Sequence, residues 1–134
     1  MNDEIKDIRW KQRFTNYEKA FRLLENTLLI KKPSEAERAG LIQFFEITFE
    51  LAWKLLKDYQ EEEGLIIKSP RDAKKQTFQA GFIKNGHTWM DALTDRSLTT
   101  HTYEEATAIE LENKIRSSYF PLLADLNHDF KQKG

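Results

Sequence analysis

Apolar side chains in the first part of the chain recur in alternating steps of four and three residues. They are Trp10, Phe14, Tyr17, Phe21, Leu24 and Leu28. This spacing places all six on one face of an α-helix, because the helix turns once about every 3.6 residues. The pattern predicts a helix from about residue 4 to 30 whose aromatic stripe lies in the core. Pro33 predicts that the helix has ended by that point, since proline cannot continue it.

A second long helix is predicted after Ser34. Ser34 and Glu37 have the spacing of a capping box, in which each side chain accepts a hydrogen bond from the other residue's backbone N–H. Two adjacent rows, apolar except for one threonine, follow at helical spacing: Leu41, Ile42, Phe45, Thr48, Phe49, Ala52, Trp53, Leu55, Leu56 and Tyr59. So broad a surface predicts that the helix is central in the fold or lies in a subunit interface. Gly64 predicts the end of this second helix, because glycine readily adopts the left-handed conformation that often follows a helix.

Three further helices are predicted in the second half of the chain. A serine cap followed by proline starts a short helix at about residues 69–80. Another runs from about residue 87 to near residue 100. Thr102 and Glu105 have capping-box spacing and predict the start of a last, long helix. Pro121 lies inside that last pattern, so we expect a kink or a break there.

The whole pattern is helical, with no strand-like alternation and no internal repeat. A length of 134 residues corresponds to one domain, over residues 1–134, and is long enough to bury a substantial core. The predicted fold class is all-α: an antiparallel (up-and-down) four-helix bundle with an additional short helix.

Composition excludes several function classes. Cysteine is absent, so the chain has neither a disulfide framework nor a thiolate metal site. Three histidines, at positions 87, 101 and 128, are too scattered for a metal-ligand spacing, and we expect no metal and no cofactor. The acidic N-terminus lacks the apolar stretch of a secretory signal, and no apolar run approaches the length of a membrane span. We therefore expect a cytoplasmic protein without membrane contact.

The net charge of −1 excludes general binding of polyanions, so any contact with nucleic acid must come from a local patch. Arg71, Lys74 and Lys75 form such a patch on the predicted short helix, where Asp72 is the only acid between residues 65 and 88. This basic face is a candidate site for phosphates or RNA. A solvated basic face is the alternative interpretation.

A polar strip lies along the second predicted helix. Glu46, Glu50, Lys54 and Lys57 have helical spacing, and Glu50 and Lys54 form an i,i+4 pair. The strip is typical of a solvated face. The sequence leaves open whether Glu46 and Glu50 instead line a cleft.

The segment from Asp95 to Tyr103 holds the strongest candidate chemistry. Arg96, His101 and Tyr103 are separated by five and two residues, where one predicted helix ends and the next begins. Arginine presents a planar fork of donors to phosphate oxygens, and histidine exchanges a proton near neutral pH. The structural alternative is a helix cap, a hydrogen-bonded histidine and a packed ring.

Several stretches of the chain resemble a known family when taken in order. They are FEITFELAWKLLKDY (45–59), SPR (69–71), AGFI (80–83) and DRSLTTHTYEE (95–105). Together they resemble the nucleotidyltransferase substrate-binding protein branch of the HEPN superfamily. The resemblance extends from about Gly40 to Leu123.

The resemblance implies a helical bundle that forms a two-fold homodimer and partners a minimal nucleotidyltransferase encoded nearby. Such pairs are similar to HepT/MntA toxin–antitoxin systems, in which the HEPN subunit cuts RNA and the transferase attaches AMP to a tyrosine. Carried over to this chain, Arg96 and His101 match the catalytic ribonuclease pair, and Tyr103 matches the modified tyrosine. Ser97 departs from the family, which often has an amide or an acid at this position.

The implied chemistry is metal-independent RNA cleavage. His101 would act as acid or base, and Arg96 would stabilise the charge on the phosphate, with Ser97 and Glu50 as possible supporting residues. AMP on Tyr103 would place a bulky anion beside the pair and block it. The alternative function is a non-catalytic subunit that binds a nucleotide or another substrate for the transferase. A purely structural helical adaptor is the third hypothesis.

Overall fold

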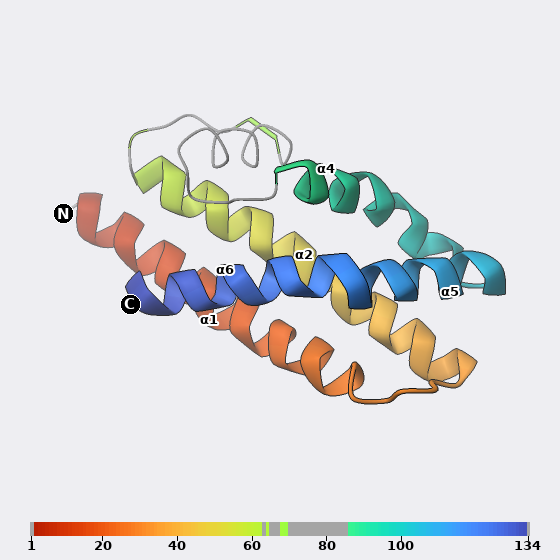
Figure 1. Cartoon of the computed structure of the whole chain (residues 1–134). Coiled ribbons are helices and arrows are strands. Elements are labelled where there is room, and N and C mark those ends of the chain that lie inside the picture. Colours follow the sequence, from red (N-terminus) through yellow and green to blue (C-terminus); the bar gives the residue numbers. More distant parts are fainter. Residues whose placement is uncertain (1, 63, 65–67, 70–85, 134) are drawn as a thin grey trace.

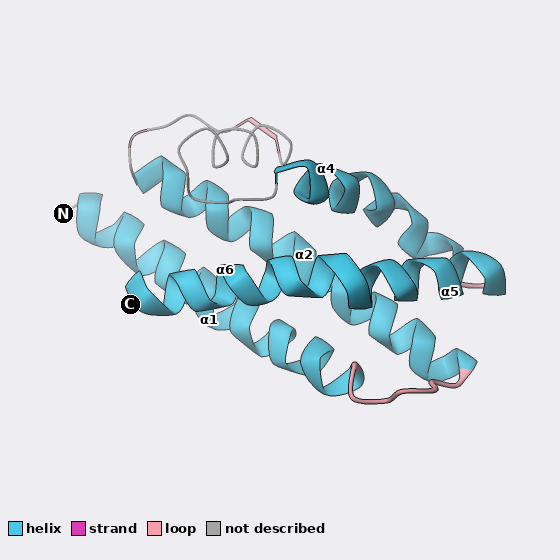
Figure 2. Cartoon of the chain, in the orientation of Figure 1, coloured by secondary structure: helices cyan, strands magenta, loops and turns pink. Residues whose placement is uncertain are grey.

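Every regular element in the described part of the chain is a helix (Figures 1 and 2). The computed structural model describes residues 2–62, 64, 68–69 and 86–133. The elements are α1 (Asn2–Thr27), α2 (Glu35–Glu62), α4 (Gly86–Asp95), the 3₁₀ helix η1 (Arg96–His101), α5 (Glu105–Lys114), the π-helical turn η2 (Ile115–Tyr119) and α6 (Phe120–Lys133). The short helix expected at 69–80 lies outside the described residues, apart from Ser69.

The helices run up and down, as the pattern predicts. In Figure 1, α1 and α2 form an antiparallel hairpin, and the continuous rod α5–η2–α6 runs back toward the end at which the chain begins. The all-α bundle expected from the sequence is confirmed. Within the described ranges, no helix is both long and apolar enough to cross a membrane.

The capping box at the start of α2 is confirmed. The backbone N–H of Ser34 donates to Glu37 Oε1 at 2.9 Å, and the N–H of Glu37 donates to Ser34 Oγ at 3.2 Å. Two backbone donors at the helix start are therefore satisfied by side chains. Beyond the other end of α2, Gly64 has a φ of 90°, the left-handed conformation expected there.

Helix α2 is central, because it packs against α1, α5, α6 and η1. Most of its two apolar rows are buried, and they meet the aromatic stripe of α1 in a single core. Tyr17 is fully buried there and its hydroxyl donates to the carbonyl of Leu123 at 2.5 Å, which ties α1 to α6. Burial alone raises the pKa of Tyr17 well above its ordinary value, so the hydroxyl remains a donor.

The expected capping box at Thr102 is wrong. Thr102 has helical dihedral angles (φ −65°, ψ −15°) and closes η1, whereas α5 begins at Glu105 with Glu104 as its N-cap. The N–H of Glu104 donates to the carbonyl of His101 at 3.0 Å, so the chain turns tightly between the two helices. A residue still in the preceding helix cannot cap the next one.

Pro121, where the sequence predicts a kink or a break, does not break the chain, because it is the second residue of α6 (Phe120–Lys133). The irregularity lies just before the proline, in the wide turn η2, where the N–H of Phe120 donates five residues back to Ile115. Proline has no N–H to donate and its ring crowds the preceding turn. A π turn is one way for a helix to accommodate this, and it leaves the rod continuous.

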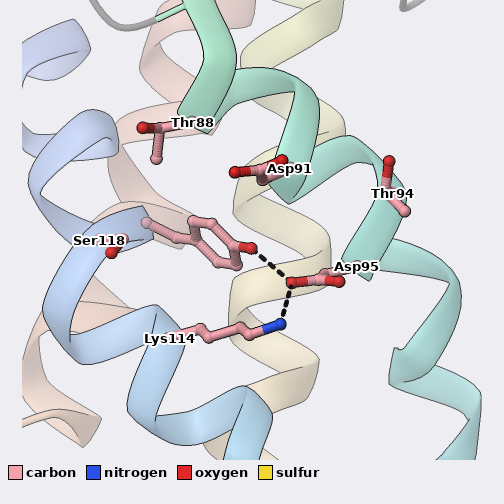
Figure 3. A pocket seen from close by; sticks show the side chains of 7 residues that line it. Thr88, Asp91, Thr94, Asp95, Lys114 and Ser118 are labelled. Carbon is pink, nitrogen blue, oxygen red and sulfur yellow. Dashed lines mark hydrogen bonds and ion pairs between the residues drawn. The ribbon is translucent and has the colours of Figure 1, made fainter.

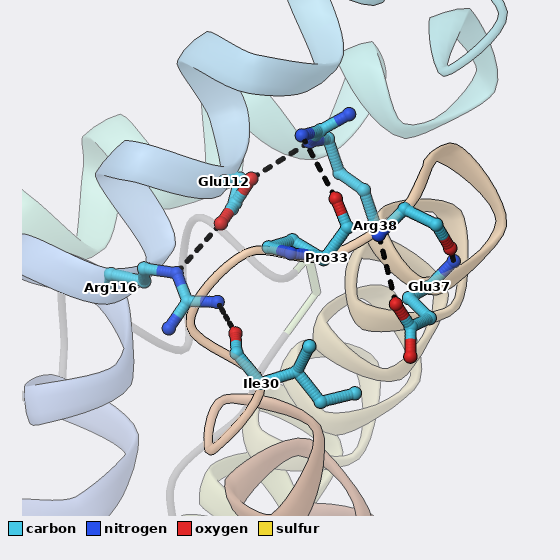
Figure 4. A network of polar contacts seen from close by, with 7 residues as sticks. Ile30, Pro33, Glu37, Arg38, Glu112 and Arg116 are labelled. Atoms are coloured by element: carbon cyan, nitrogen blue, oxygen red, sulfur yellow. Dashed lines mark hydrogen bonds and ion pairs between the residues drawn. The ribbon is translucent and has the colours of Figure 1, made fainter.

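An ion network fastens the α1–α2 loop to α5 (Figure 4). Glu112 is 6% exposed, and its two oxygens accept from Arg38 Nε and Arg116 Nε, each at 2.8 Å. The other nitrogens of Arg116 donate to the carbonyls of Leu28 at 2.8 Å and Ile30 at 2.6 Å. Burial raises the pKa of Glu112, but the two arginines outweigh this effect and lower it below its usual value.

Glu112→Ala should lower the free energy of unfolding by about 2–3 kcal/mol, because two half-buried guanidinium groups lose their acceptor. Urea unfolding at pH 7 measures this difference. Since the folded-state pKa of Glu112 is lowered, the contribution is complete at neutral pH and fades as the pH falls through that pKa. Glu110→Ala is the control, because Glu110 pairs with Lys114 at 3.5 Å on an exposed surface and should change stability by about 0.5 kcal/mol or less. Equal losses in the two variants would contradict the prediction.

Candidate functional site

The predicted site residues lie where α4 gives way to η1. Arg96 is the first residue of η1, His101 is the last, and Tyr103 lies in the turn before α5. Asp95, the last residue of α4, fixes this junction: its Oδ2 accepts from the hydroxyl of Tyr119 and from Lys114 Nζ, the latter at 3.2 Å (Figure 3). The segment from Asp95 to Tyr103 therefore begins at a junction that is bonded to α5 and η2.

Arg96 is held against α2 by Glu50. One oxygen of the Glu50 carboxylate accepts from Arg96 Nη1, and the other accepts from the indole Nε1 of Trp53. Both members of the ion pair are partly exposed, at 29% for the arginine side chain and 37% for the glutamate side chain. Glu50 thus contacts the site, and its carboxylate bonds to Arg96 and Trp53 rather than to Lys54 in the expected i,i+4 pair. Glu46 is half-buried on the same helix.

His101 and Tyr103 form the second half of the site. His101 Nδ1 lies 3.4 Å from the hydroxyl of Tyr103, and the two rings are 5.9 Å apart at 51°. Both side chains are exposed, Tyr103 by 77%. Tyr103 also borders a small hollow of about 90 Å³ beside Arg38. The phenol is therefore accessible from solvent and within reach of an imidazole nitrogen.

Within one chain, Arg96 and His101 make no hydrogen bond to each other, although both lie among the described residues. A 3₁₀ helix has about three residues per turn, so five residues rotate the side chain by about 600°, leaving the two about 120° apart. Arg96 is turned to α2, and His101 is turned to Tyr103. One chain presents two half-sites at the two ends of η1.

The other sequence candidates divide into two groups. The hydroxyl of Ser97 is exposed and donates to the carbonyl of Thr94 at 2.9 Å, so it closes the end of α4. Arg71, Lys74 and Lys75 lie outside the described residues. In the part of the chain that is described, no three His, Cys, Asp or Glu side chains gather in a way that could hold a metal ion.

Sequence reasoning missed Trp53 as a partner of the site and missed the junction of Asp95 with Lys114 and Tyr119. These partners lie 19 and 24 residues from Asp95 along the chain. No periodic pattern connects positions so far apart on different helices. The only available signal is that Asp95 and Glu50 both lie within the stretches that carry the family resemblance.

Comparison with known proteins identifies the family of this chain. A model of the family described as "Nucleotidyltransferase substrate binding protein like" matches residues 12–132. The chain belongs to this family. The match spans nearly the whole sequence, including α2, η1 and both halves of the site, and it confirms the resemblance found in the sequence.

A solved relative of this nucleotidyltransferase substrate-binding protein-like chain has the same fold. A crystal structure of a protein from Thermus thermophilus superposes with a TM-score of 0.74 at 32% sequence identity, covering 87% of this chain and 97% of the other. None of the curated proteins compared with the chain matches it.

Glu50→Gln should keep the fold and loosen Arg96. The amide retains an acceptor for Arg96 or Trp53 but removes the charge, and a partly exposed pair of this kind contributes about 1 kcal/mol or less to stability. In a ¹⁵N NMR spectrum, the indole Nε1–H resonance of Trp53 should move, while those of Trp10 and Trp89 stay in place. An unchanged Trp53 resonance would show that Glu50 does not hold this corner of the site in solution.

Proposed function

We propose that this chain partners a minimal nucleotidyltransferase and is itself a metal-independent endoribonuclease, silenced by AMP transfer to Tyr103. Its family membership supports the pairing with a nucleotidyltransferase. One observation carries the rest: η1 presents a guanidinium anchored by Glu50 at one end and an exposed imidazole beside a tyrosine hydroxyl at the other. These are the groups that RNA cleavage and its control require.

Cleavage needs the two half-sites to meet across a two-fold homodimer. In one chain they point about 120° apart, because a 3₁₀ helix has about three residues per turn. A two-fold axis near η1 brings two copies of each group into one cleft, since a symmetric interface places the same patch of both subunits together. The arginine of one copy then faces the histidine of its partner. The basic residues Arg71, Lys74 and Lys75 are candidates to guide the RNA backbone into this cleft.

The reaction requires no cofactor. The 2′-hydroxyl of RNA attacks the adjacent phosphorus, the bond to the 5′-oxygen breaks, and the products are a 2′,3′-cyclic phosphate and a free 5′-hydroxyl. His101 takes the proton from the 2′-hydroxyl or gives one to the 5′-oxygen. Arg96 stabilises the negative charge that accumulates on the phosphorus oxygens. Glu50 holds the guanidinium in place.

Tyr103 suits the role of the modified residue. Of the four tyrosines, Tyr17 and Tyr119 are buried, Tyr59 is half-buried, and only Tyr103 is exposed. The transferase would join the phenolic oxygen to the α-phosphorus of ATP and release pyrophosphate, and His101 Nδ1, at 3.4 Å, is placed to accept the phenolic proton. The attached AMP would then cover His101 and present an anion to Arg96.

His101→Ala should reduce cleavage of cellular RNA about 10²–10⁴-fold, because the general acid or base is lost. Expression without the transferase, followed by RNA electrophoresis and growth measurement, tests this. His128→Ala, which changes an exposed histidine of α6, should leave both readouts unchanged. Equal RNA integrity for the native chain and His101→Ala would remove the nuclease proposal.

The same proposal predicts complementation between two inactive chains. Arg96→Ala and His101→Ala homodimers each lack one half of every pair, but a mixed dimer retains one arginine and one histidine across the axis. Co-expression should restore part of the cleavage, and sedimentation should find dimers at micromolar concentration. Monomers, or no restoration in a confirmed mixed dimer, would contradict a composite site.

Tyr103→Phe should abolish labelling by the transferase with α-³²P-ATP, because the only exposed phenol is removed. The Tyr103→Phe chain should also remain toxic when the transferase is present. Tyr59→Phe is the control and should be labelled like the native chain. Labelling that persists in Tyr103→Phe would assign the modification to another residue.

The non-catalytic subunit is the second candidate, and the placement of His101 favours it: within one chain the imidazole lies beside Tyr103 and makes no hydrogen bond to Arg96, whose guanidinium is paired with Glu50. Binding of AMP or ATP with intact RNA would support it. Absence of binding, with and without the transferase, would exclude it.

A further inference from the structure

A second cavity lies beside the motif, between α4 and the segment formed by α5 and η2 (Figure 3). Its volume is about 390 Å³, which falls within the range of about 300–1,000 Å³ for sites of small ligands. Every side chain that lines it is polar: Thr88, Asp91, Thr94, Asp95, Lys114, Ser118 and Tyr119. Asp91 and Thr94 are exposed, so the cavity is open to solvent.

The walls of the cavity follow from the two helices that form it. Thr88, Asp91 and Thr94 are spaced by three residues, which places them on one face of α4, while Trp89 and Ala92 face the core. On the opposite wall, the extra residue in the π turn η2 shifts the helical register just where Ser118 and Tyr119 line the cavity. Single π turns of this kind occur frequently at functional sites.

The charge inside the cavity is negative. Lys114 is the only cation among the lining residues, and its Nζ already contacts Asp95 at 3.2 Å and Glu110 at 3.5 Å. Tyr119 donates its hydroxyl to Asp95, and its pKa is raised by burial first and then by Asp95 and Asp91, so it remains a donor. Asp91 makes no hydrogen bond or ion pair with any described residue. Its carboxylate is available to a ligand.

We propose that this cavity binds a small hydroxylated amine. The ammonium group lies against Asp91 and the outer oxygen of Asp95, and the ligand's hydroxyls meet those of Thr88, Thr94 and Ser118. A phosphate is disfavoured, because it faces two carboxylates across a lysine whose charge is already shared. This site is separate from Arg96 and His101, and the proposal stands whether or not the chain cuts RNA.

Glucosamine is a suitable probe, because it combines one ammonium group with several hydroxyls. Titrated into the full-length ¹⁵N-labelled chain at pH 7, it should give saturable shifts of the backbone amides of Asp91, Thr94 and Ser118 in the millimolar range. N-acetylglucosamine has the same hydroxyls but no charge and should bind at least about fivefold more weakly, as expected for loss of one partly exposed ion pair. Putrescine, an amine without hydroxyls, should also bind more weakly.

Asp91→Asn should weaken glucosamine binding by about fivefold, since the surface change removes the unpaired carboxylate without disturbing the core. Asp125→Asn, a matched change on the exposed face of α6, should leave binding unchanged. Circular dichroism checks that both variants fold. Equal binding of glucosamine and N-acetylglucosamine, no saturable shifts, or an unaffected Asp91→Asn would overturn the proposal. Putrescine that binds as tightly as glucosamine would overturn the role of the hydroxyls.

Discussion

The structure depends on covering helix α2, whose apolar side chains extend over too wide an arc for one neighbour to bury. Phe45 stacks on Tyr119 of η2 with ring centroids 5.6 Å apart, and Phe49 meets Trp89 of α4 at 5.9 Å. These ring contacts hold the second half of the chain against α2. Glu50, the residue after Phe49, lies at the edge of this apolar surface and pairs with Arg96. The same packing therefore builds the core and positions the candidate site.

The two segments that depart from α-helical geometry, η1 and η2, carry polar side chains of the candidate site and of the cavity beside it. The 3₁₀ helix η1 carries Arg96 at its start and His101 at its end, and the π turn η2 carries Tyr119, whose hydroxyl reaches Asp95. In a regular α-helix, residues five apart are separated by about 7.5 Å along the axis. The tighter 3₁₀ turn lengthens this separation to about 10 Å and spreads the two groups along the segment. The cavity beside the junction lies between α4 on one side and the end of α5 and η2 on the other.

Electrostatics divides the molecule into a structural and a chemical region. Glu112 is nearly buried between Arg38 and Arg116, and three further arginine nitrogens donate to backbone carbonyls of the loop. That network is structural. By contrast, Arg96, His101 and Tyr103 are each partly or largely exposed, and Asp91 has no partner among the described residues. A ligand or a second subunit can therefore approach the groups around the α4–η1 junction.

The sequence by itself determined the all-α fold, the core stripe beginning at Trp10, the Ser34–Glu37 cap and the family, because these depend on local periodicity, local hydrogen bonds and ordered motifs. It also identified Arg96, His101 and Tyr103 as candidates. It was wrong about Thr102, since Glu104 caps α5, and the irregularity expected at Pro121 lies in the turn η2 just before it. Only the tertiary structure decided that Glu50 holds Arg96 and that Asp95 bonds to Lys114 and Tyr119. Those contacts join residues far apart in the chain, and their geometry follows from how the helices pack.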